Sequence, residues 1–156
     1  GILIADATPP QRAGQTFAAA VAATGARLRL NALTHFSHWI TPIEEPRRFD
    51  THFFLARFPE GNVAEPDGSE TLTAEWFAPS DAVRLARSGE RPIIFPTMLN
   101  LERLAESSSS SEAIAAAQAR PLVTIEPLVN VQEDGSRVVT IPAGAGYAVT
   151  EWHDSR

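Results

Sequence analysis

Cysteine and lysine are both absent from this chain of 156 residues, in which all 13 basic side chains other than histidine are arginines. Without cysteine, the chain has no thiol nucleophile, no disulfide and no thiolate ligand for zinc. Without lysine, it has no amine that forms a Schiff base and no lysine of the kind found in phosphate-binding P-loops. These absences exclude several enzyme classes and direct attention to carboxylates, histidines and arginines.

The chain also lacks a surplus of positive charge and long apolar runs. Its formal net charge of −6 argues against general nucleic-acid binding, which requires a basic surface. No run reaches the roughly 18 apolar residues of a membrane span, and no basic signal-peptide region opens the chain. With 44% hydrophobic and 21% charged residues, the composition is typical of a globular protein. We expect a cytoplasmic protein with a small-molecule substrate and no nucleic-acid or membrane partner; the sequence leaves a homodimer open.

Two alternating stretches predict a pair of strands in the first half of the chain. Residues 34–41 and 50–57 are rich in aromatic and β-branched side chains at a period of two. Pro42 and Pro46 cannot donate to a strand ladder, so they bracket the connection between the strands. The sequence therefore predicts a hairpin with a short polar loop.

That loop carries two acids, Glu44 and Glu45, followed by two arginines, Arg47 and Arg48. Guanidinium groups beside a strand end suit a phosphate or carboxylate ligand, because each presents a planar fork of donors. The residues by themselves also fit a solvated hairpin tip with local ion pairs, which are common and weak at protein surfaces. On residue types alone, the solvated tip is the simpler interpretation.

A series of short motifs continues along the chain in a fixed order. The series comprises Trp39-x-Thr41-Pro42, Arg48-Phe49-Asp50-Thr51-x-Phe53-Phe54, Glu70, Glu75-Trp76-Phe77-x-Pro79 and Phe95-Pro96-Thr97. It resembles the Nudix hydrolases, specifically the group of peroxisomal coenzyme A diphosphatases and their bacterial relatives. The resemblance covers roughly residues 1–106, which we interpret as the remainder of a Nudix domain. Residues 107–156 are expected to add a linker, a short helix and a hairpin that pack on the same domain.

Most of the family's signature is missing from the chain. The signature ends in Arg-Glu-hydrophobic-x-Glu-Glu-x-Gly-hydrophobic, and Gly1-Ile2 resembles only its last two positions. In the family, this segment supplies the carboxylates that hold Mg²⁺ or Mn²⁺, hard cations that take oxygen ligands. Because the chain does not begin with methionine, we expect the rest of the signature upstream of Gly1 and an inactive product when this chain is made alone.

The resemblance implies an α/β fold of the Nudix type, with a mixed sheet between helices, an incomplete N-terminus and a C-terminal β-hairpin extension. It implies metal-dependent hydrolysis of a diphosphate linked to another moiety in the full-length parent, with coenzyme A or an acyl-CoA as the favoured substrate and Mg²⁺ or Mn²⁺ as cofactor. The alternative is a non-catalytic Nudix-like module that binds a nucleotide or a protein. The encoding DNA upstream of Gly1 distinguishes the two.

The same resemblance suggests roles for individual residues. Arg47 and Arg48 would bind phosphate, and Asp50 would orient Arg48 or the loop backbone. Trp39 and Phe49 would pack near a ring or the pantetheine arm, although core packing is the simpler interpretation of both. Glu70 is a weak candidate for a catalytic or metal-binding carboxylate, because related enzymes draw an additional acid from a loop; a solvated loop acid fits it equally well.

Histidines at positions 35, 38 and 52 raise the question of a metal site, with Glu44 or Glu45 as a further ligand. His35 and His38 are three residues apart, so they face opposite sides of a regular strand and converge only if the strand contains a bulge. We therefore expect surface or partly buried histidines.

Local signals place the other elements. An Ala-rich helix is predicted over residues 13–24, and Pro79 and Pro96 are predicted to open two more. Ser111 is predicted to cap a fourth helix. Residues 71–77 are predicted to form a further strand with Leu72 and Trp76 as anchors. Asp134-Gly135 lies between β-branched runs and predicts a hairpin turn.

Overall fold

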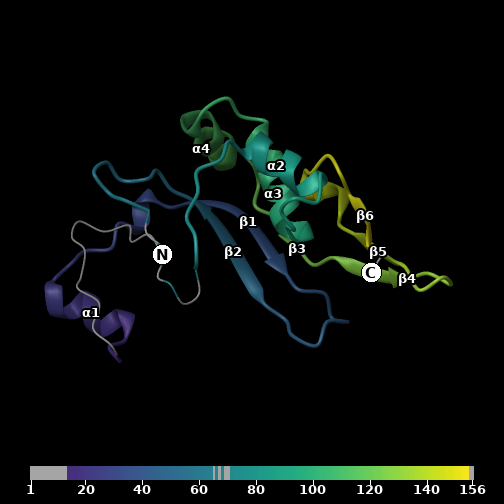
Figure 1. The fold of residues 1–156 in the computed structure, drawn as a ribbon, viewed down its shortest axis with the longest axis horizontal. Coiled ribbons are helices and arrows are strands. Elements are labelled where there is room, and N and C mark those ends of the chain that lie inside the picture. Colours follow the sequence, from purple (N-terminus) through teal and green to yellow (C-terminus); the bar gives the residue numbers. More distant parts are fainter. Residues whose placement is uncertain (1–13, 65, 67, 69–70, 155–156) are drawn as a thin grey trace. The chain divides into compact units, whose positions relative to one another are not determined.

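The computed structural model describes residues 14–64, 66, 68 and 71–154. The chain divides into two compact units (Figure 1). One unit comprises residues 1–33 and 56–76, and the other comprises residues 34–55 and 77–156. Two positions singled out in the sequence, the Gly1-Ile2 pair and Glu70, lie outside the described residues.

The first unit contains the predicted Ala-rich helix, α1 (Phe17–Thr24). The Thr16 side chain caps its start by accepting from the Ala19 N–H at 3.3 Å, and Gly25 follows its end with a φ of 65°. Such a left-handed residue is the usual helix stop, and glycine adopts it without strain. A 3₁₀ turn, η1 (Leu30–Ala32), follows in the same unit.

The strand predicted over residues 71–77 is wrong, because this segment is irregular in the structure. Leu72 and Trp76, its expected anchors, are 75% and 73% exposed. Alternation makes a strand stable only when a partner strand completes the hydrogen bonds and one face is buried. Neither anchor is buried here.

The second unit contains the predicted strand pair. β1 (Thr34–Ile40) and β2 (Asp50–Leu55) are antiparallel, and β3 (Thr124–Ile125) runs parallel to β1 on its other edge. The strand order β2-β1-β3 makes a small mixed sheet. The register between β1 and β2 shifts between His35 and Ser37, which marks a β-bulge. A bulge inserts one extra residue into a strand and so changes which side chains share a face.

The C-terminal hairpin is confirmed and gains a third strand. β4 (Leu128–Val131), β5 (Arg137–Thr140) and β6 (Glu151–Asp154) form an antiparallel sheet in that order. Gly135, with a φ of 84°, lies in the turn between β4 and β5. The Asp134 carboxylate closes this turn by accepting from the Ser136 N–H at 2.9 Å. The described residues therefore form a mixed α/β structure with two three-stranded sheets.

Three helices complete this unit: α2 (Pro79–Arg87), α3 (Phe95–Ala105) and α4 (Ser110–Ala119). Prolines lie in the first turns of α2 and α3, as predicted. The cap of α4 is Ser109 and not Ser111, because the Ser109 hydroxyl accepts from the Glu112 N–H. The Glu112 carboxylate in turn accepts from the Ser108 N–H at 2.7 Å, so Ser109 and Glu112 have capping-box spacing. No helix among the described residues is long and apolar enough to span a membrane.

The hydrophobic core of the second unit joins β1, β3 and α3 to the segment before β6. Leu99 and Ile125 are each only 1% exposed. The other buried members are Trp39, Ile141, Ala145 and Tyr147. This core fixes α3 against the strand pair. It therefore determines which side chains line the space beside the two strands.

A buried polar network crosses this core. The Asn100 side-chain oxygen accepts from the Ser37 hydroxyl at 2.9 Å and from the Tyr147 hydroxyl at 2.6 Å. Asn100 is 5% exposed and Ser37 is 2% exposed. The network therefore connects β1, α3 and the segment before β6 at a place that water does not reach.

Replacing Asn100 by alanine is expected to lower the free energy of unfolding by about 1–3 kcal/mol, because two buried hydroxyls lose their acceptor. Urea unfolding followed by circular dichroism measures the change. Asn130→Ala is the matched control: Asn130 is exposed on β4, so its replacement should stay within about 0.5 kcal/mol of the parent. Equal losses for the two variants would show that the network adds nothing measurable.

Candidate functional site

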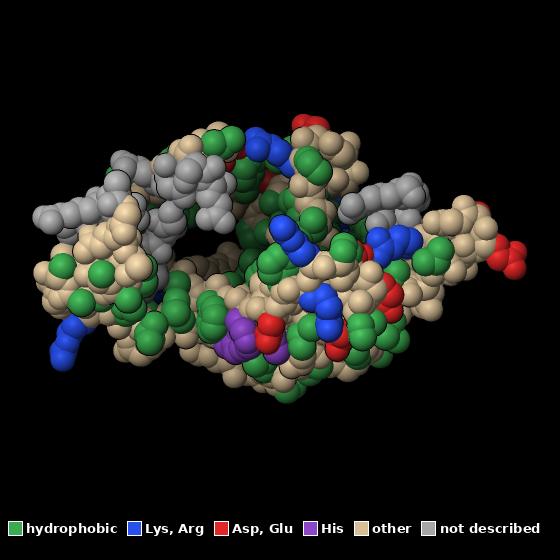
Figure 2. Space-filling model, turned by 90° about the horizontal axis from the view of Figure 1, so that it is seen from below, with side chains coloured by type: hydrophobic (Ala, Val, Ile, Leu, Met, Phe, Trp, Pro, Cys, Tyr) green, Lys and Arg blue, Asp and Glu red, His purple; other side chains and the backbone are tan. Residues whose placement is uncertain are grey.

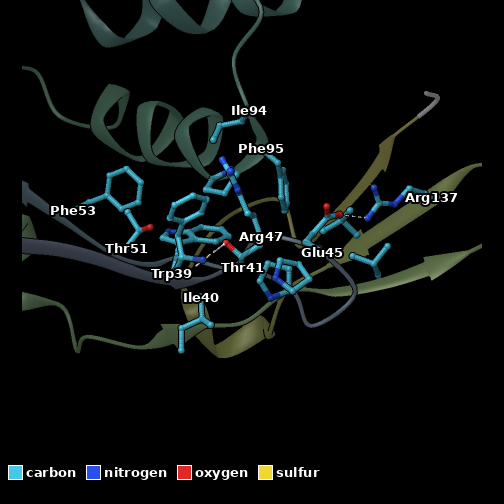
Figure 3. A pocket seen from close by; sticks show the side chains of 16 residues that line it. Trp39, Ile40, Thr41, Glu45, Arg47, Thr51, Phe53, Ile94, Phe95 and Arg137 are labelled. Carbon is cyan, nitrogen blue, oxygen red and sulfur yellow. Dashed lines mark hydrogen bonds and ion pairs between the residues drawn. The ribbon is translucent and has the colours of Figure 1, made fainter. Parts of the chain in front are cut away.

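A pocket of about 430 Å³ lies beside the β1–β2 pair (Figure 3). The strands supply Trp39, Thr51 and Phe53, and the start of α3 supplies Phe95 and Pro96. Trp39 packs edge-on against Phe95, with ring centroids 6.1 Å apart. The wall of the pocket is thus largely apolar, and Trp39, Phe49, Phe53 and Phe95 are its aromatic members. The N-terminal end of a helix carries partial positive charge, so the position of α3 favours an anionic ligand.

Charged side chains lie at the margin of this pocket. Arg47 lines it from the loop between β1 and β2, is exposed, and has no hydrogen-bond or ion-pair partner within the described part of the chain. Glu45 and Arg137 also line the pocket and form an ion pair that connects the loop to β5. Arg47 is therefore a pocket cation whose donors are available to a ligand.

The second arginine of the loop is engaged by the protein. The Arg48 Nε donates to the Thr41 carbonyl at 2.9 Å, and a terminal nitrogen donates to the Glu126 carboxylate at 2.5 Å. Thr41 and Phe49 close the loop by two further bonds, each 3.0 Å long. Arg48 thus holds the loop against the segment after β3, while Phe49, 61% exposed, lines the pocket.

Trp39 is a core residue, which is the simpler of the two interpretations of its role in the sequence. Its side chain is only 3% exposed and belongs to the hydrophobic core, although its ring also lines the pocket. A residue so deeply buried offers little surface to a ligand. Phe49 is the more accessible of the two aromatic residues singled out in the sequence.

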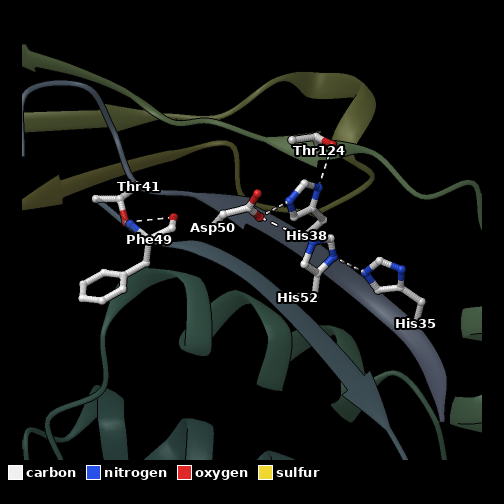
Figure 4. Close-up of polar contacts among 7 residues, drawn as sticks. All are labelled: His35, His38, Thr41, Phe49, Asp50, His52 and Thr124. Carbon is white, nitrogen blue, oxygen red and sulfur yellow. Dashed lines mark hydrogen bonds and ion pairs between the residues drawn. The ribbon is translucent and has the colours of Figure 1, made fainter. Parts of the chain in front are cut away.

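Asp50 lies on the other face of the strand pair (Figure 4). Residues alternate between faces along a strand, so Asp50 shares a face with His52 and not with Thr51. Its carboxylate accepts from the His38 Nε2 at 2.5 Å and lies 3.4 Å from the His52 Nε2. The structure therefore places Asp50 with two histidines, whereas Arg48 is held by Thr41 and Glu126.

His35, His38 and His52 are exposed or partly buried, as expected, and the bulge in β1 provides the condition under which His35 and His38 converge. His38 pairs with His52 in the ladder, and their rings stack with centroids 4.0 Å apart. The shift between His35 and Ser37 brings His35 to the same group, where its Nε2 lies 3.0 Å from the His52 Nδ1. Histidine side chains also gather in one place on the face shown in Figure 2.

The protonation state of His35 follows from its surroundings. Partial burial, followed by the neighbouring His52 and then His38, lowers the pKa of His35. The neutral ring is therefore favoured, and a neutral imidazole keeps one nitrogen as a hydrogen-bond acceptor. This agrees with the short contact between His35 and His52.

Among the described residues, one group of at least three potential metal ligands comes together: His38, Asp50 and His52, whose ligand atoms lie within 4.8 Å of one another. Neither Glu44 nor Glu45, the acids that the sequence suggested as further ligands, joins this group. Glu45 pairs with Arg137. In α3, Glu102 is held by Arg87 at 2.7 Å and Glu106 by Arg120 at 2.5 Å.

Comparison with known proteins supports the resemblance. No family model matches the chain, and no solved structure matches it. The Homo sapiens acyl-coenzyme A diphosphatase NUDT19 is 33% identical to it over an alignment of 109 residues that covers 67% of this chain and 29% of that protein. The resemblance to Nudix coenzyme A diphosphatases is confirmed.

The match to this group extends to a second relative. The Xenopus laevis acyl-coenzyme A diphosphatase NUDT19 is 30% identical over an alignment of 123 residues that covers 74% of this chain and 32% of that protein. The chain thus spans about a third of the length of these curated relatives. What it does as part of such an enzyme is therefore a matter for proposal.

Proposed function

We propose that the pocket beside β1 and β2 binds coenzyme A or an acyl-CoA, as part of a diphosphatase whose catalytic carboxylates lie outside the described residues. The observation that carries this proposal is a largely apolar pocket with an arginine at its margin that has no partner among the described residues. The pocket includes residues of the motifs on which the resemblance to the Nudix coenzyme A diphosphatases rests, among them Trp39, Phe49 and Phe95. The substrate class follows the names of those relatives.

Coenzyme A has an anionic part and a less polar part, and the pocket offers a cation and apolar side chains to match them. Coenzyme A joins an adenine nucleotide through a diphosphate to a long pantetheine arm. Phe49, Phe53 and Phe95 offer apolar surface to the arm or the acyl chain. Arg47 offers its fork of donors to a phosphate, the geometry in which guanidinium groups bind such anions most strongly. Arg48 acts by fixing the loop that carries Arg47 and Phe49.

The divalent ion of the proposed reaction, Mg²⁺ or Mn²⁺, does not fit the residues described here. Both ions prefer oxygen ligands, and the one ligand group found contains two imidazoles and lies on the face opposite the pocket. Glu102 and Glu106 are held by arginines. We therefore assign no metal-dependent step to the described residues. Those that line the pocket are assigned to substrate binding.

Replacing Arg47 by alanine is expected to weaken the binding of coenzyme A by about 10-fold or more, because a charged hydrogen bond contributes about 1.5–3 kcal/mol. Isothermal titration calorimetry on the full 156-residue chain measures this. The matched control is Arg29→Ala, because Arg29 is an exposed arginine in the other compact unit. Unchanged affinity in the Arg47 variant would remove its role, and a folded parent chain that does not bind coenzyme A would overturn the pocket assignment.

A second candidate function is a non-catalytic nucleotide-binding module. It is favoured by the lack of any group of three carboxylates among the described residues. Both candidates predict binding, so binding alone does not separate them. Reading the encoding DNA does: an Arg-Glu-x-x-Glu-Glu segment in frame before Gly1 supports the enzyme, and a start codon at that position supports the module.

A further inference from the structure

We propose that His38, Asp50 and His52 form a binding site for a divalent transition-metal ion, Zn²⁺ in particular. None of the three lines the pocket described above. The site lies on the opposite face of the β1–β2 pair, so this inference does not depend on the proposed function.

The ligand atoms are close to the spacing that zinc requires. The Asp50 carboxylate oxygen lies 2.5 Å from the His38 Nε2 and 3.4 Å from the His52 Nε2. Tetrahedral zinc, with bonds of about 2.0–2.2 Å to nitrogen and oxygen, places its ligand atoms on the order of 3.3 Å apart. All three side chains start from one face of two paired strands, but the His38 and His52 rings stack in nearly parallel planes, so at least one ring must rotate before both Nε2 atoms point at one ion.

The second nitrogen of each histidine ring is already held. The His38 Nδ1 lies 2.8 Å from the Thr124 hydroxyl on β3, and the His52 Nδ1 lies 3.0 Å from the His35 Nε2 (Figure 4). Histidines that bind metals nearly always engage their other ring nitrogen in this way, which orients the ring and fixes the tautomer. Thr124 and His35 therefore turn the Nε2 atoms of both ligands toward Asp50.

The donor set and its exposure determine which ion fits. Two imidazoles and one carboxylate suit zinc and its neighbours, whereas magnesium and manganese prefer oxygen-rich sites. The His38 side chain is 14% exposed, while those of His52 and Asp50 are 44% and 65% exposed. The group is thus anchored on one side and open on the other, where a water molecule can supply a fourth ligand.

Metal titration of the full chain, freed of any affinity tag and of chelatable metal, tests the proposal. We expect one Zn²⁺ per chain by calorimetry, a visible absorption spectrum of coordinated Co²⁺, and an unfolding midpoint that rises with Zn²⁺ concentration. Excess Mg²⁺ should not displace the bound ion. No binding of Zn²⁺ or Co²⁺ by the folded chain would overturn the proposal.

Variants separate this site from adventitious binding. His38→Gln, His52→Gln and Asp50→Asn should each abolish the Co²⁺ spectrum. His35→Gln should retain binding with an affinity about 10-fold lower, because it removes only an orienting contact. The matched control is His153→Gln, which changes a 70% exposed histidine on β6 and should leave the affinity unchanged.

Two outcomes of the variant series would contradict the proposal. One is equal loss of affinity in the His153 and His52 variants, and the other is full affinity in Asp50→Asn. Circular dichroism of each metal-free variant shows whether it is folded. If His38→Gln disturbs the sheet, Asp50→Asn remains decisive, because the Asp50 side chain is mostly exposed.

Discussion

Replacement of Trp39 by alanine is expected to lower the free energy of unfolding by about 3–5 kcal/mol, the cost of truncating a buried aromatic side chain. The indole is only 3% exposed. It packs against Phe95 and Tyr147, with ring centroids 6.1 and 5.6 Å away. Small domains have a total stability of about 5–15 kcal/mol, so this loss is a large share of the total. Urea unfolding measures the difference.

Two further variants sharpen this prediction. Trp76→Ala is the matched control, since its ring is 73% exposed and contacts Phe58, and its loss should cost about 1 kcal/mol. Trp39→Phe should cost less than Trp39→Ala, because the indole Nε1 has no hydrogen-bond partner among the described residues and only ring volume is removed. Equal stability of the Trp39→Ala and Trp76→Ala variants would contradict the central position of Trp39 in the core.

Metal-dependent turnover of coenzyme A, an acyl-CoA or ADP-ribose is expected to be absent from the purified 156-residue chain, in Mg²⁺ and in Mn²⁺. Hydrolysis of a diphosphate requires divalent metal to neutralise charge as water attacks phosphorus. Several carboxylates must converge to hold that metal, and without it they repel one another. The described residues provide no such group. Without this catalysis, the rate of diphosphate hydrolysis is expected to be lower by at least about 10⁶-fold.

The controls for this prediction distinguish inactivity from misfolding. Coenzyme A binding by the same preparation shows that the pocket is formed, and the Homo sapiens NUDT19 protein, assayed in parallel, shows that the assay detects turnover. Activity that survives stringent purification and disappears on Glu70→Gln would place a catalytic carboxylate within this chain. Activity that requires Zn²⁺ and disappears on His52→Gln would assign catalysis to the histidine group.

Local patterns in the sequence predicted those elements that depend mainly on the residues of a single segment. The period-two stretches became β1 and β2. Gly25 ends α1, and the Asp134-Gly135 pair turns β4 into β5. Each of these outcomes depends on side-chain alternation or on a backbone conformation that one residue type favours. Both kinds of signal can be recognised within a single segment of the sequence. The resemblance to coenzyme A diphosphatases could also be recognised from the sequence, because it rests on an ordered series of motifs.

Pairing between distant segments decided the rest. The bulge in β1 arises from its register with β2, and it alone brings His35 to the side of His38 and His52. Likewise, Glu126 lies 78 residues from Arg48 and engages it, whereas Arg47 lines the pocket without a partner among the described residues. By itself the sequence determined which residue types and elements this protein has. Only the tertiary structure decided which side chains meet, because strand register and long-range ion pairs depend on segments that no local pattern connects.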